Sequence, residues 1–288
     1  MNTETSAYFK QYHKIDIDVV FNDKVIVITK LKLGHSKCRE LFLGSEQSHI
    51  NSHFVCNFHT LEILTQELNS EDSHTKKFIK IWESVLNKTE KRDIVLIYRN
   101  PISTWLSGFY QDTINAYDNK FFLDAPYFTE YINSLNHDHI TTQNFLRDFK
   151  KETAIGTLFK KEEYIPIISD ILSKNLEYYM INNKLGTAHT KSWIPFIYKL
   201  INSKQIDTAK IKLLDLYDAR LEHQLKNYLN IQKINQGDYR RTPIEMELLF
   251  DIVASSNHSH TITTFLKEDY NLYIDLKENY KQYHLNYE

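Results

Sequence analysis

The hexapeptide DIVLIY, residues 93–98, constrains the fold more than any other stretch of the chain. It is a short apolar and β-branched run bounded by polar residues, which is the pattern of a buried strand. Arg99 and Asn100 follow it, and Pro101 then opens a segment with helical spacing. Asn is a favoured N-cap, and Pro fits the first helical position because its missing N–H would be unsatisfied there. The sequence therefore predicts a strand that runs directly into a helix.

The same alternation recurs elsewhere in the chain. Further strands are predicted at residues 24–30 (KVIVITK), 53–59 (HFVCNFH) and 157–159 (TLF). Helices are predicted at residues 36–43, 60–69 and 75–88, and helical patterns dominate beyond residue 125. Apolar runs separated by helical segments indicate a parallel sheet with helices on its faces. We predict an α/β fold with a central parallel sheet flanked by helices and a helix-rich C-terminal half, in one domain over residues 1–288.

Composition excludes several classes of protein. The 42% hydrophobic and 25% charged residues are typical of a soluble globular chain, and 288 residues can bury a sizeable core. A net charge of −2 disfavours a general nucleic-acid binder, which would carry a basic excess. Two cysteines cannot form a disulfide framework, and no apolar run reaches the length of a membrane span. The first residues lack the apolar segment of a signal peptide, so we expect a cytoplasmic protein.

The turn after the first predicted strand, LKLGHSK at residues 31–37, has the residues of an anion site. A turn between a parallel strand and a helix offers free backbone N–H groups and the positive end of the helix dipole. Gly34 allows close approach, Ser36 supplies a hydroxyl, and Lys32 and Lys37 add positive charge. The turn lacks the GK[ST] ending of the common nucleotide-binding loop, which disfavours an ordinary kinase or ATPase. The alternative is a solvated, lysine-rich turn.

A second anion site is predicted where strand 93–98 meets the following helix. Arg99 can present a planar fork to a phosphate, and Ser107 can add a hydroxyl from the helix. Thr104 and Ser107 are three residues apart and share a helix face. The alternative roles are a surface ion pair for Arg99 and simple packing for Ser107.

Together the two stretches resemble the sulfotransferase family that uses 3′-phosphoadenosine-5′-phosphosulfate (PAPS). LKLGHS is similar to the family's 5′-phosphosulfate loop, commonly PKSGTT, with Lys32, Gly34 and Ser36 at matching positions. YRNPISTWLSGFY resembles the 3′-phosphate motif, in which Arg99 and Ser107 match together with Pro101 and Phe109.

Weaker similarities and some departures accompany these motifs. The segments TLFKKEEYIPIISDIL (157–172) and FLKEDYNLYIDL (265–276) are similar to later parts of the family, the second to its carbohydrate-modifying branch. Leu33 and His35 replace small hydroxyl residues of the phosphosulfate loop. Thr104 stands where many members carry a second arginine.

The resemblance implies a reaction and roles for residues. PAPS would be the sulfuryl donor, held by Lys32, Gly34, His35, Ser36, Lys37, Arg99 and Ser107. A hydroxyl, on a carbohydrate or a small molecule, would be the acceptor, and no metal is implied. Lys32 would neutralise the charge on the leaving bisphosphate, and the base would be His59, at the end of the predicted strand 53–59, with His53, His35 or Glu62 as alternatives.

Two other functions fit parts of the pattern. A P-loop kinase-like phosphotransferase shares the strand–loop–helix architecture, but needs a GK[ST] loop and a metal-binding Asp after a strand, where DIVLIYRN has Arg99. A non-catalytic binding protein could use the same scaffold with a degenerate site.

The roles of Lys32 and His59 differ in a way that kinetics can test. Lys32→Ala should lower turnover by orders of magnitude with every acceptor, because the charge it meets develops only in the transition state. His59→Ala should lose on the order of 10²–10⁴ with an alcohol acceptor and much less with an acidic phenol. The measurement is turnover of both variants across acceptors of graded pKa. Near-wild-type turnover of His59→Ala with the alcohol would show that another residue is the base.

Overall fold

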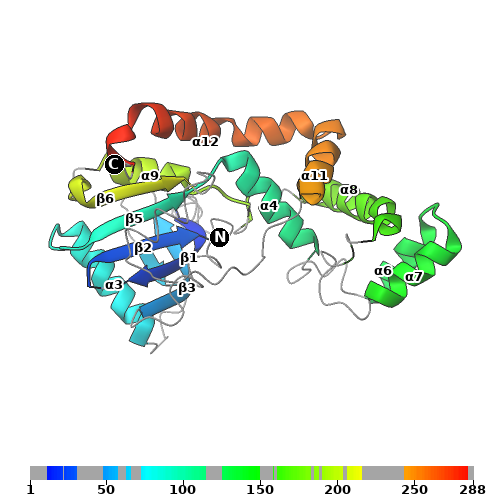
Figure 1. Ribbon diagram of the computed structural model, residues 1–288, viewed down its shortest axis with the longest axis horizontal. Helices are drawn as coiled ribbons and strands as arrows, with labels where there is room; N and C mark the ends of the chain where they lie inside the picture. The colour runs from blue at the N-terminus through cyan, green and yellow to red at the C-terminus, as the bar shows by residue number, and fades with distance from the viewer. Residues whose placement is uncertain are drawn as a thin grey trace, which may run out of the picture. The chain divides into compact units, whose positions relative to one another are not determined.

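The computed structural model describes residues 12–21, 23–30, 48–57, 63–65, 73–114, 125–149, 158, 161–182, 185–187, 190–203, 206–215 and 243–284 (Figure 1). Residues 31–47, which hold the predicted phosphosulfate loop and the predicted helix 36–43, lie outside these ranges, and so does His59.

The described strands form one six-stranded mixed sheet. They are β1 (Tyr12–Phe21), β2 (Val25–Lys30), β3 (Ser48–Asn57), β4 (Ile63–Thr65), β5 (Asp93–Tyr98) and β6 (Ile211–Asp215), in the spatial order β4-β3-β1-β2-β5-β6. Strands β2, β5 and β6 are parallel neighbours. Strand β1 pairs antiparallel with both β2 and β3, and β4 pairs antiparallel with β3. The predicted α/β class with parallel strands and flanking helices is confirmed, although half of the sheet is antiparallel.

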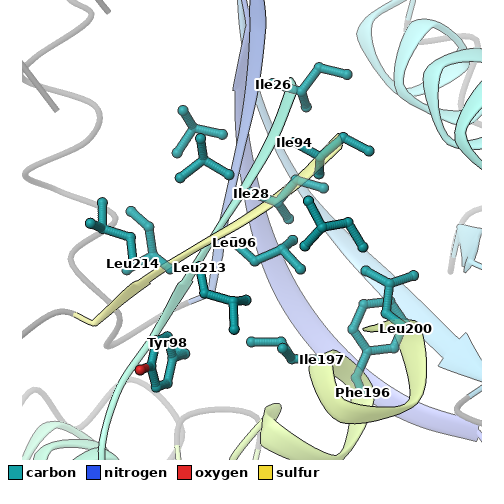
Figure 2. Close-up of a cluster of buried hydrophobic side chains, with 14 of the residues drawn as sticks. Ile26, Ile28, Ile94, Leu96, Tyr98, Phe196, Ile197, Leu200, Leu213 and Leu214 are labelled. Atoms are coloured by element: carbon teal, nitrogen blue, oxygen red, sulfur yellow. The ribbon is translucent and has the colours of Figure 1, made fainter. Parts of the chain in front are cut away.

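The parallel part of the sheet is covered on both faces. Val25–Thr29 of β2 and Ile94–Tyr98 of β5 are buried without interruption. Successive side chains of a strand point to opposite faces, so five consecutive buried residues require packing on both sides. The packing comes from α3 (Ser73–Leu86), α9 (Ile194–Ile201) and the C-terminal part of α12 (Ser259–Asn279), whose buried residues join the strands in one hydrophobic cluster. Figure 2 shows part of this cluster around Leu96 and Leu213.

Contacts divide the chain into two compact units. The first comprises residues 1–104, 192–238 and 268–288 and contains the sheet. The second comprises residues 105–191 and 239–267. Its helices are most of α4 (Pro101–Ile114), α6 (Ala125–Ser134), α7 (His139–Phe149), α8 (Ile165–Ile181), α11 (Pro243–Ser255) and the beginning of α12. The expectation of one domain over residues 1–288 stays a prediction.

The second unit has its own core, with a buried polar network at its side. Trp105 and Phe109 of α4 stack with ring centroids 5.3 Å apart. The indole Nε1 of Trp105 donates to the carbonyl of Leu185 at 3.0 Å. The buried carboxylate of Asp112 accepts hydrogen bonds from the Tyr179 hydroxyl at 2.6 Å and the Thr187 hydroxyl at 2.8 Å. Because a buried carboxylate requires such donors, this network fixes α4 against α8 and the turn at residues 185–187.

Most predicted elements with long apolar runs are confirmed. Strands β2 and β5 match the predictions at 24–30 and 93–98, α3 matches 75–88, and α4 begins at Pro101 as predicted. Strand β3 covers most of the prediction at 53–59 but begins earlier, at Ser48.

Other predictions are wrong or incomplete. The helix predicted at 60–69 is wrong, because Ile63–Thr65 form edge strand β4 against β3. Such a short stretch fits either period, and pairing with β3 decides it. Of the strand predicted at 157–159, only Leu158 is described, and it lies in a 3₁₀ turn. Strands β1 and β6 were not predicted.

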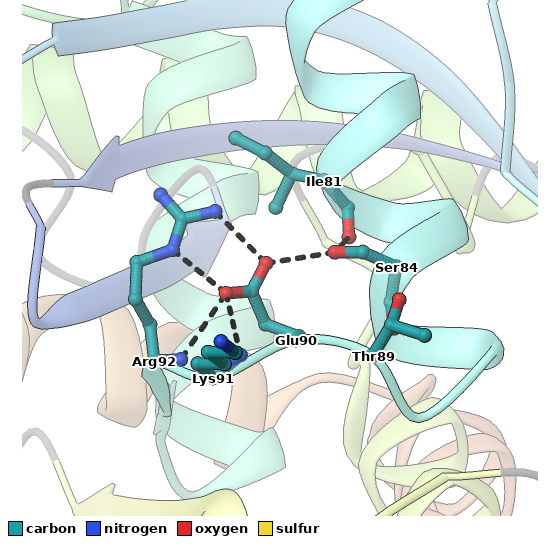
Figure 3. A network of polar contacts seen from close by, with 6 residues as sticks. All are labelled: Ile81, Ser84, Thr89, Glu90, Lys91 and Arg92. Atoms are coloured by element: carbon teal, nitrogen blue, oxygen red, sulfur yellow. Dashed lines mark hydrogen bonds and ion pairs between the residues drawn. The ribbon is translucent and has the colours of Figure 1, made fainter.

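The turn between α3 and β5 is held by a carboxylate network (Figure 3). Glu90 accepts two hydrogen bonds from the guanidinium of Arg92, both at 2.8 Å, and one from the Ser84 hydroxyl at 2.7 Å. The backbone N–H groups of Lys91 and Arg92 donate to the same carboxylate at 3.0 and 3.1 Å. Five donors on one carboxylate fix the chain immediately before β5 begins.

Glu90 should make the stability of the first unit depend on pH. The Arg92 hydrogen bond, opposed by burial and helped by Ser84, lowers the pKa of Glu90 to about 2 from 4.5. A depressed folded-state pKa stabilises the fold fully above about pH 4.5, and this contribution is lost as the pH falls towards about 2. Glu90→Gln should therefore reduce the free energy of unfolding by about 1 kcal/mol at pH 7, since the network is partly open to solvent.

Urea unfolding of wild type and Glu90→Gln between pH 7 and pH 3.5 measures this effect. The difference between the two proteins should shrink below pH 4.5. Glu83→Gln, at an exposed position of the preceding helix α3, is the matched control. A difference that is constant over this pH range would contradict the assignment to Glu90.

Candidate sheet-edge site

The carboxyl ends of the parallel strands β2, β5 and β6 lie together and form one edge of the sheet. Ile28 pairs with Leu96, and each strand ends two residues later, at Lys30 and Tyr98. Tyr98 in turn pairs with Asp215, the last residue of β6. In open α/β sheets, ligands bind outside the carboxyl ends of the strands. The chain thus leaves β2 towards Lys32 at the same edge from which it leaves β5 towards Arg99.

The predicted phosphosulfate loop lies outside the described residues. This applies to Lys32, Gly34, His35, Ser36 and Lys37, so their predicted roles stay predictions. The structure fixes only the strand from which this loop departs.

Of the candidate bases, His53 lies within a described strand, β3. Strand β3 runs in the same direction as β2, because each is antiparallel to β1 between them. Ile17 of β1 pairs with both Lys30 and Ser52, so His53 lies one residue past the level at which β2 ends. Asn57, the end of β3, lies five residues past that level, roughly 16 Å along the strand direction. His59 follows Asn57 outside the described residues, and so does Glu62.

The entry to α4 is formed as predicted. The side-chain oxygen of Asn100 accepts the N–H of Ile102 at 2.9 Å and that of Ser103 at 3.4 Å. Its carbonyl accepts the N–H of Thr104 at 2.9 Å. Asn100 is therefore the N-cap, and Pro101 is the first helical residue. Since the cap already occupies the first amides of the helix, an anion at this end would be bound mainly by side chains, of which Arg99 is the nearest in sequence.

Arg99 and Ser107 occupy different surroundings. Arg99 is half-buried and follows directly on the last residue of β5. Ser107 is buried in the second turn of α4, about 9 Å along the axis from Pro101. Thr104 is also buried, and its hydroxyl donates to the carbonyl of Asn100 at 3.0 Å. A hydroxyl at a buried helix position is consistent with either role predicted for Ser107, phosphate donor or small packing residue.

Sequence reasoning missed a cluster of polar and aromatic side chains at the same edge. The Tyr273 hydroxyl of α12 donates to Asp215 at 3.1 Å, and Lys277 forms an ion pair with the same carboxylate at 3.2 Å. The ring of Tyr273 lies 5.8 Å from the ring of Tyr98. The hydroxyl of Tyr98 is 3.0 Å from Nε2 of His284. The i, i+4 spacing of Tyr273 and Lys277 could have suggested a shared helix face, but not their partners on the sheet.

The protonation of this cluster follows from burial and from Asp215. Burial, with the charge of Asp215 next, raises the pKa of Tyr273 to about 12, so the residue remains a neutral phenol. Burial alone would lower the pKa of Lys277, but the hydrogen bond and charge of Asp215 raise it above the ordinary value. Lys277 is therefore a firmly protonated ammonium beside the end of β6.

Among the residues that the structure describes, no group of three or more His, Cys, Asp or Glu side chains is placed to hold a metal ion. Likewise, no helix in those ranges combines the length and the apolar character needed to cross a bilayer. Comparison with family models, with curated proteins and with solved structures found no match to the chain.

The cap of α4 can be tested separately from ligand binding. Asn100→Ala removes the acceptor for the amides of Ile102 and Ser103 and should reduce the free energy of unfolding by about 0.5–2 kcal/mol. Asn100→Asp keeps the acceptor and should stay near wild type in urea unfolding, while its negative charge disfavours an anion beside Arg99. Equal stability of Asn100→Ala and wild type would show that the cap is not important for α4.

Proposed function

We propose that the chain is a sulfotransferase that moves a sulfuryl group from PAPS to an acceptor hydroxyl, on a carbohydrate. The observation that carries this proposal is the pairing of β2 and β5 as adjacent parallel strands that end level. Each strand leads into one of the two sequence motifs that resemble the family's phosphate sites. The two motifs therefore start at neighbouring positions of one sheet edge, about 4.8 Å apart.

This arrangement suits a nucleotide with phosphates on both sides of its ribose. The donor carries a 5′-phosphosulfate and a 3′-phosphate, and so requires two anion sites separated by one sugar. The loop after β2, with Lys32, Gly34 and Ser36, would bind the 5′ group. Arg99, after β5, would bind the 3′-phosphate through its guanidinium, because the amides at the start of α4 are already capped by Asn100.

The chemistry requires in-line positioning and charge stabilisation more than covalent help. The acceptor oxygen attacks sulfur, the bond between sulfur and the bridging phosphate oxygen breaks, and adenosine 3′,5′-bisphosphate leaves. Lys32 would neutralise the charge that develops on the leaving oxygen. A histidine would take the acceptor proton, with His59 as the first candidate and His53 as the alternative nearer the level of Lys30.

The acceptor and the location of the protein complete the proposal. Residues 265–276, which resemble the carbohydrate-modifying branch of the family, form part of α12, and this helix contributes Tyr273 to the sheet edge. This supports a saccharide as the acceptor. A reducing, cytoplasmic setting agrees with a chain that has two cysteines.

Arg99 provides the sharpest test. If Arg99 reads the 3′-phosphate, Arg99→Ala should weaken binding of adenosine 3′,5′-bisphosphate about 10- to 150-fold and change binding of AMP much less. Isothermal titration without Mg²⁺ measures both affinities, and Lys80→Ala, at an exposed position of α3, is the matched control. Equal losses of affinity for the two nucleotides would show that Arg99 does not bind the 3′-phosphate.

The same measurements separate the proposed function from its alternatives. Thermal stabilisation of the wild type by adenosine 3′,5′-bisphosphate without Mg²⁺ is the expected result. Stabilisation by ATP with Mg²⁺ instead would favour a phosphotransferase, and stabilisation by neither would contradict a nucleotide-dependent enzyme.

A further inference from the structure

The C-terminal segment of the described chain returns to the sheet after α12. Residues Lys281–Tyr283 form a 3₁₀ turn, η4, and His284 then makes a parallel β-bridge with Leu213 of β6. The N–H of His284 donates to the carbonyl of Lys281 at 3.0 Å. The hydroxyl of Tyr280 donates to the side chain of Asn202 at 2.9 Å. Within the first unit, the segment is thus attached to β6 at Leu213 and to Asn202.

The side chain of His284 extends this docking to β5. Its Nε2 lies 3.0 Å from the hydroxyl of Tyr98, and its ring is nearly parallel to that of Tyr98, with an interplanar angle of 6° and centroids 5.8 Å apart. Tyr98 is buried and also contacts the ring of Tyr273. The last residue of β5 is therefore held by both α12 and the C-terminal segment, and the next residue in the chain is Arg99.

The charges around His284 come from every element packed against it. Asp215 of β6 is the acidic neighbour, and Lys277 of α12 and Lys281 of η4 are basic. Tyr273 of α12 is a neutral phenol, and the Tyr98 hydroxyl of β5 faces Nε2 of His284. Burial lowers the pKa of His284, Asp215 opposes this effect, and the two lysines reinforce it. The imidazole is thus neutral at pH 7.

The contact of His284 with Tyr98 is favoured at neutral pH and disfavoured in acid. A histidine whose folded-state pKa lies below the ordinary 6.5 favours the docked state fully above pH 6.5, and this contribution is lost as the pH falls through the folded-state value. Mild acid therefore weakens the docking of residues 280–284.

We propose that His284 is a positioning residue for the nucleotide site, acting through Tyr98 on Arg99. The proposal rests on the proposed function, in which Arg99 binds the 3′-phosphate. The guanidinium of Arg99 would bind the 3′-phosphate through directional hydrogen bonds. Small displacements of the end of β5 would therefore lower the affinity for the nucleotide. Protonation of His284 weakens the contact between Tyr98 and the C-terminal segment. Because Arg99 follows Tyr98 directly, its position then becomes less fixed.

The affinity for adenosine 3′,5′-bisphosphate should therefore depend on pH through the protonation of His284. Between pH 7.5 and 5.5 the wild type should lose more affinity than a variant that cannot titrate there, because acid protonates the His284 ring that faces Tyr98. His284→Phe keeps a ring against Tyr98 but has no titrating group. It should bind within about threefold of wild type at pH 7.5 and lose the extra pH dependence. His284→Ala should bind more weakly than wild type at pH 7.5 and approach the wild-type affinity at pH 5.5.

Two controls separate this effect from other titrations. His260→Gln removes an exposed histidine at the start of α12, in the second unit, and should keep the wild-type pH profile. The ionisation of the ligand's own phosphates is common to all variants, so it cancels in the comparison. Identical pH profiles for wild type and His284→Phe would overturn the positioning role.

Hydrogen exchange gives a readout that does not involve the nucleotide. Corrected for intrinsic rates, the amides of residues 211–215 and 280–284 should exchange faster at pH 5.5 than at pH 7.5 in wild type, and less so in His284→Phe. Acid release seen by exchange without a change in affinity would overturn the positioning role. If the wild type fails to bind adenosine 3′,5′-bisphosphate at any pH, the proposed function and the positioning role fail together, and exchange alone decides whether His284 controls the docking.

Discussion

Burial of β5 on both faces is the constraint on which the rest of the sheet edge depends. The strand is paired in parallel with β2 on one side and β6 on the other, and its residues from Ile94 to Tyr98 are buried without interruption. The indole of Trp193 donates to the carbonyl of Ile97 at 3.0 Å, and the Glu90 network fixes the turn that precedes the strand. A strand held at both ends and on both faces gives its last residues a fixed position, which a loop could not.

The residues at the junction of β5 and α4 also determine which groups could bind an anion at this junction. Helix N-termini usually offer free amides, but Asn100 takes up those of Ile102 and Ser103. Arg99, directly before Asn100, places a side-chain positive charge next to this helix. The proposed 3′-phosphate site is therefore one of side-chain recognition, whereas the sequence after β2, with its single glycine, predicts a loop that would bind phosphate through backbone amides. The two halves of the proposed nucleotide site would thus bind phosphate differently, one through a charged side chain and the other through backbone amides.

Sequence reasoning succeeded where burial is complete and local. VIVITK and DIVLIY are recognisable because strands covered on both faces are apolar at nearly every position. Strand β1 was missed although IDIDVV alternates apolar and acidic residues, as a half-covered strand does, and β6 has only five residues. The N-cap at Asn100 was predicted because its signal lies within four residues. The contact between Tyr98 and His284 joins residues 186 positions apart, and no local pattern encodes such a pair.

The bridge between Leu213 and His284 has a consequence for self-association. Strand β6 ends the strand order of the sheet and pairs with β5 on its inner side, so the bridge meets its outer side. An open outer strand presents unpaired backbone groups to which another chain can add a strand. By covering β6 at Leu213, the C-terminal segment interrupts the row of groups that a second molecule would need. The residue that we connect with the nucleotide site therefore also shields the sheet from intermolecular extension, and release of this segment in acid would remove that shield.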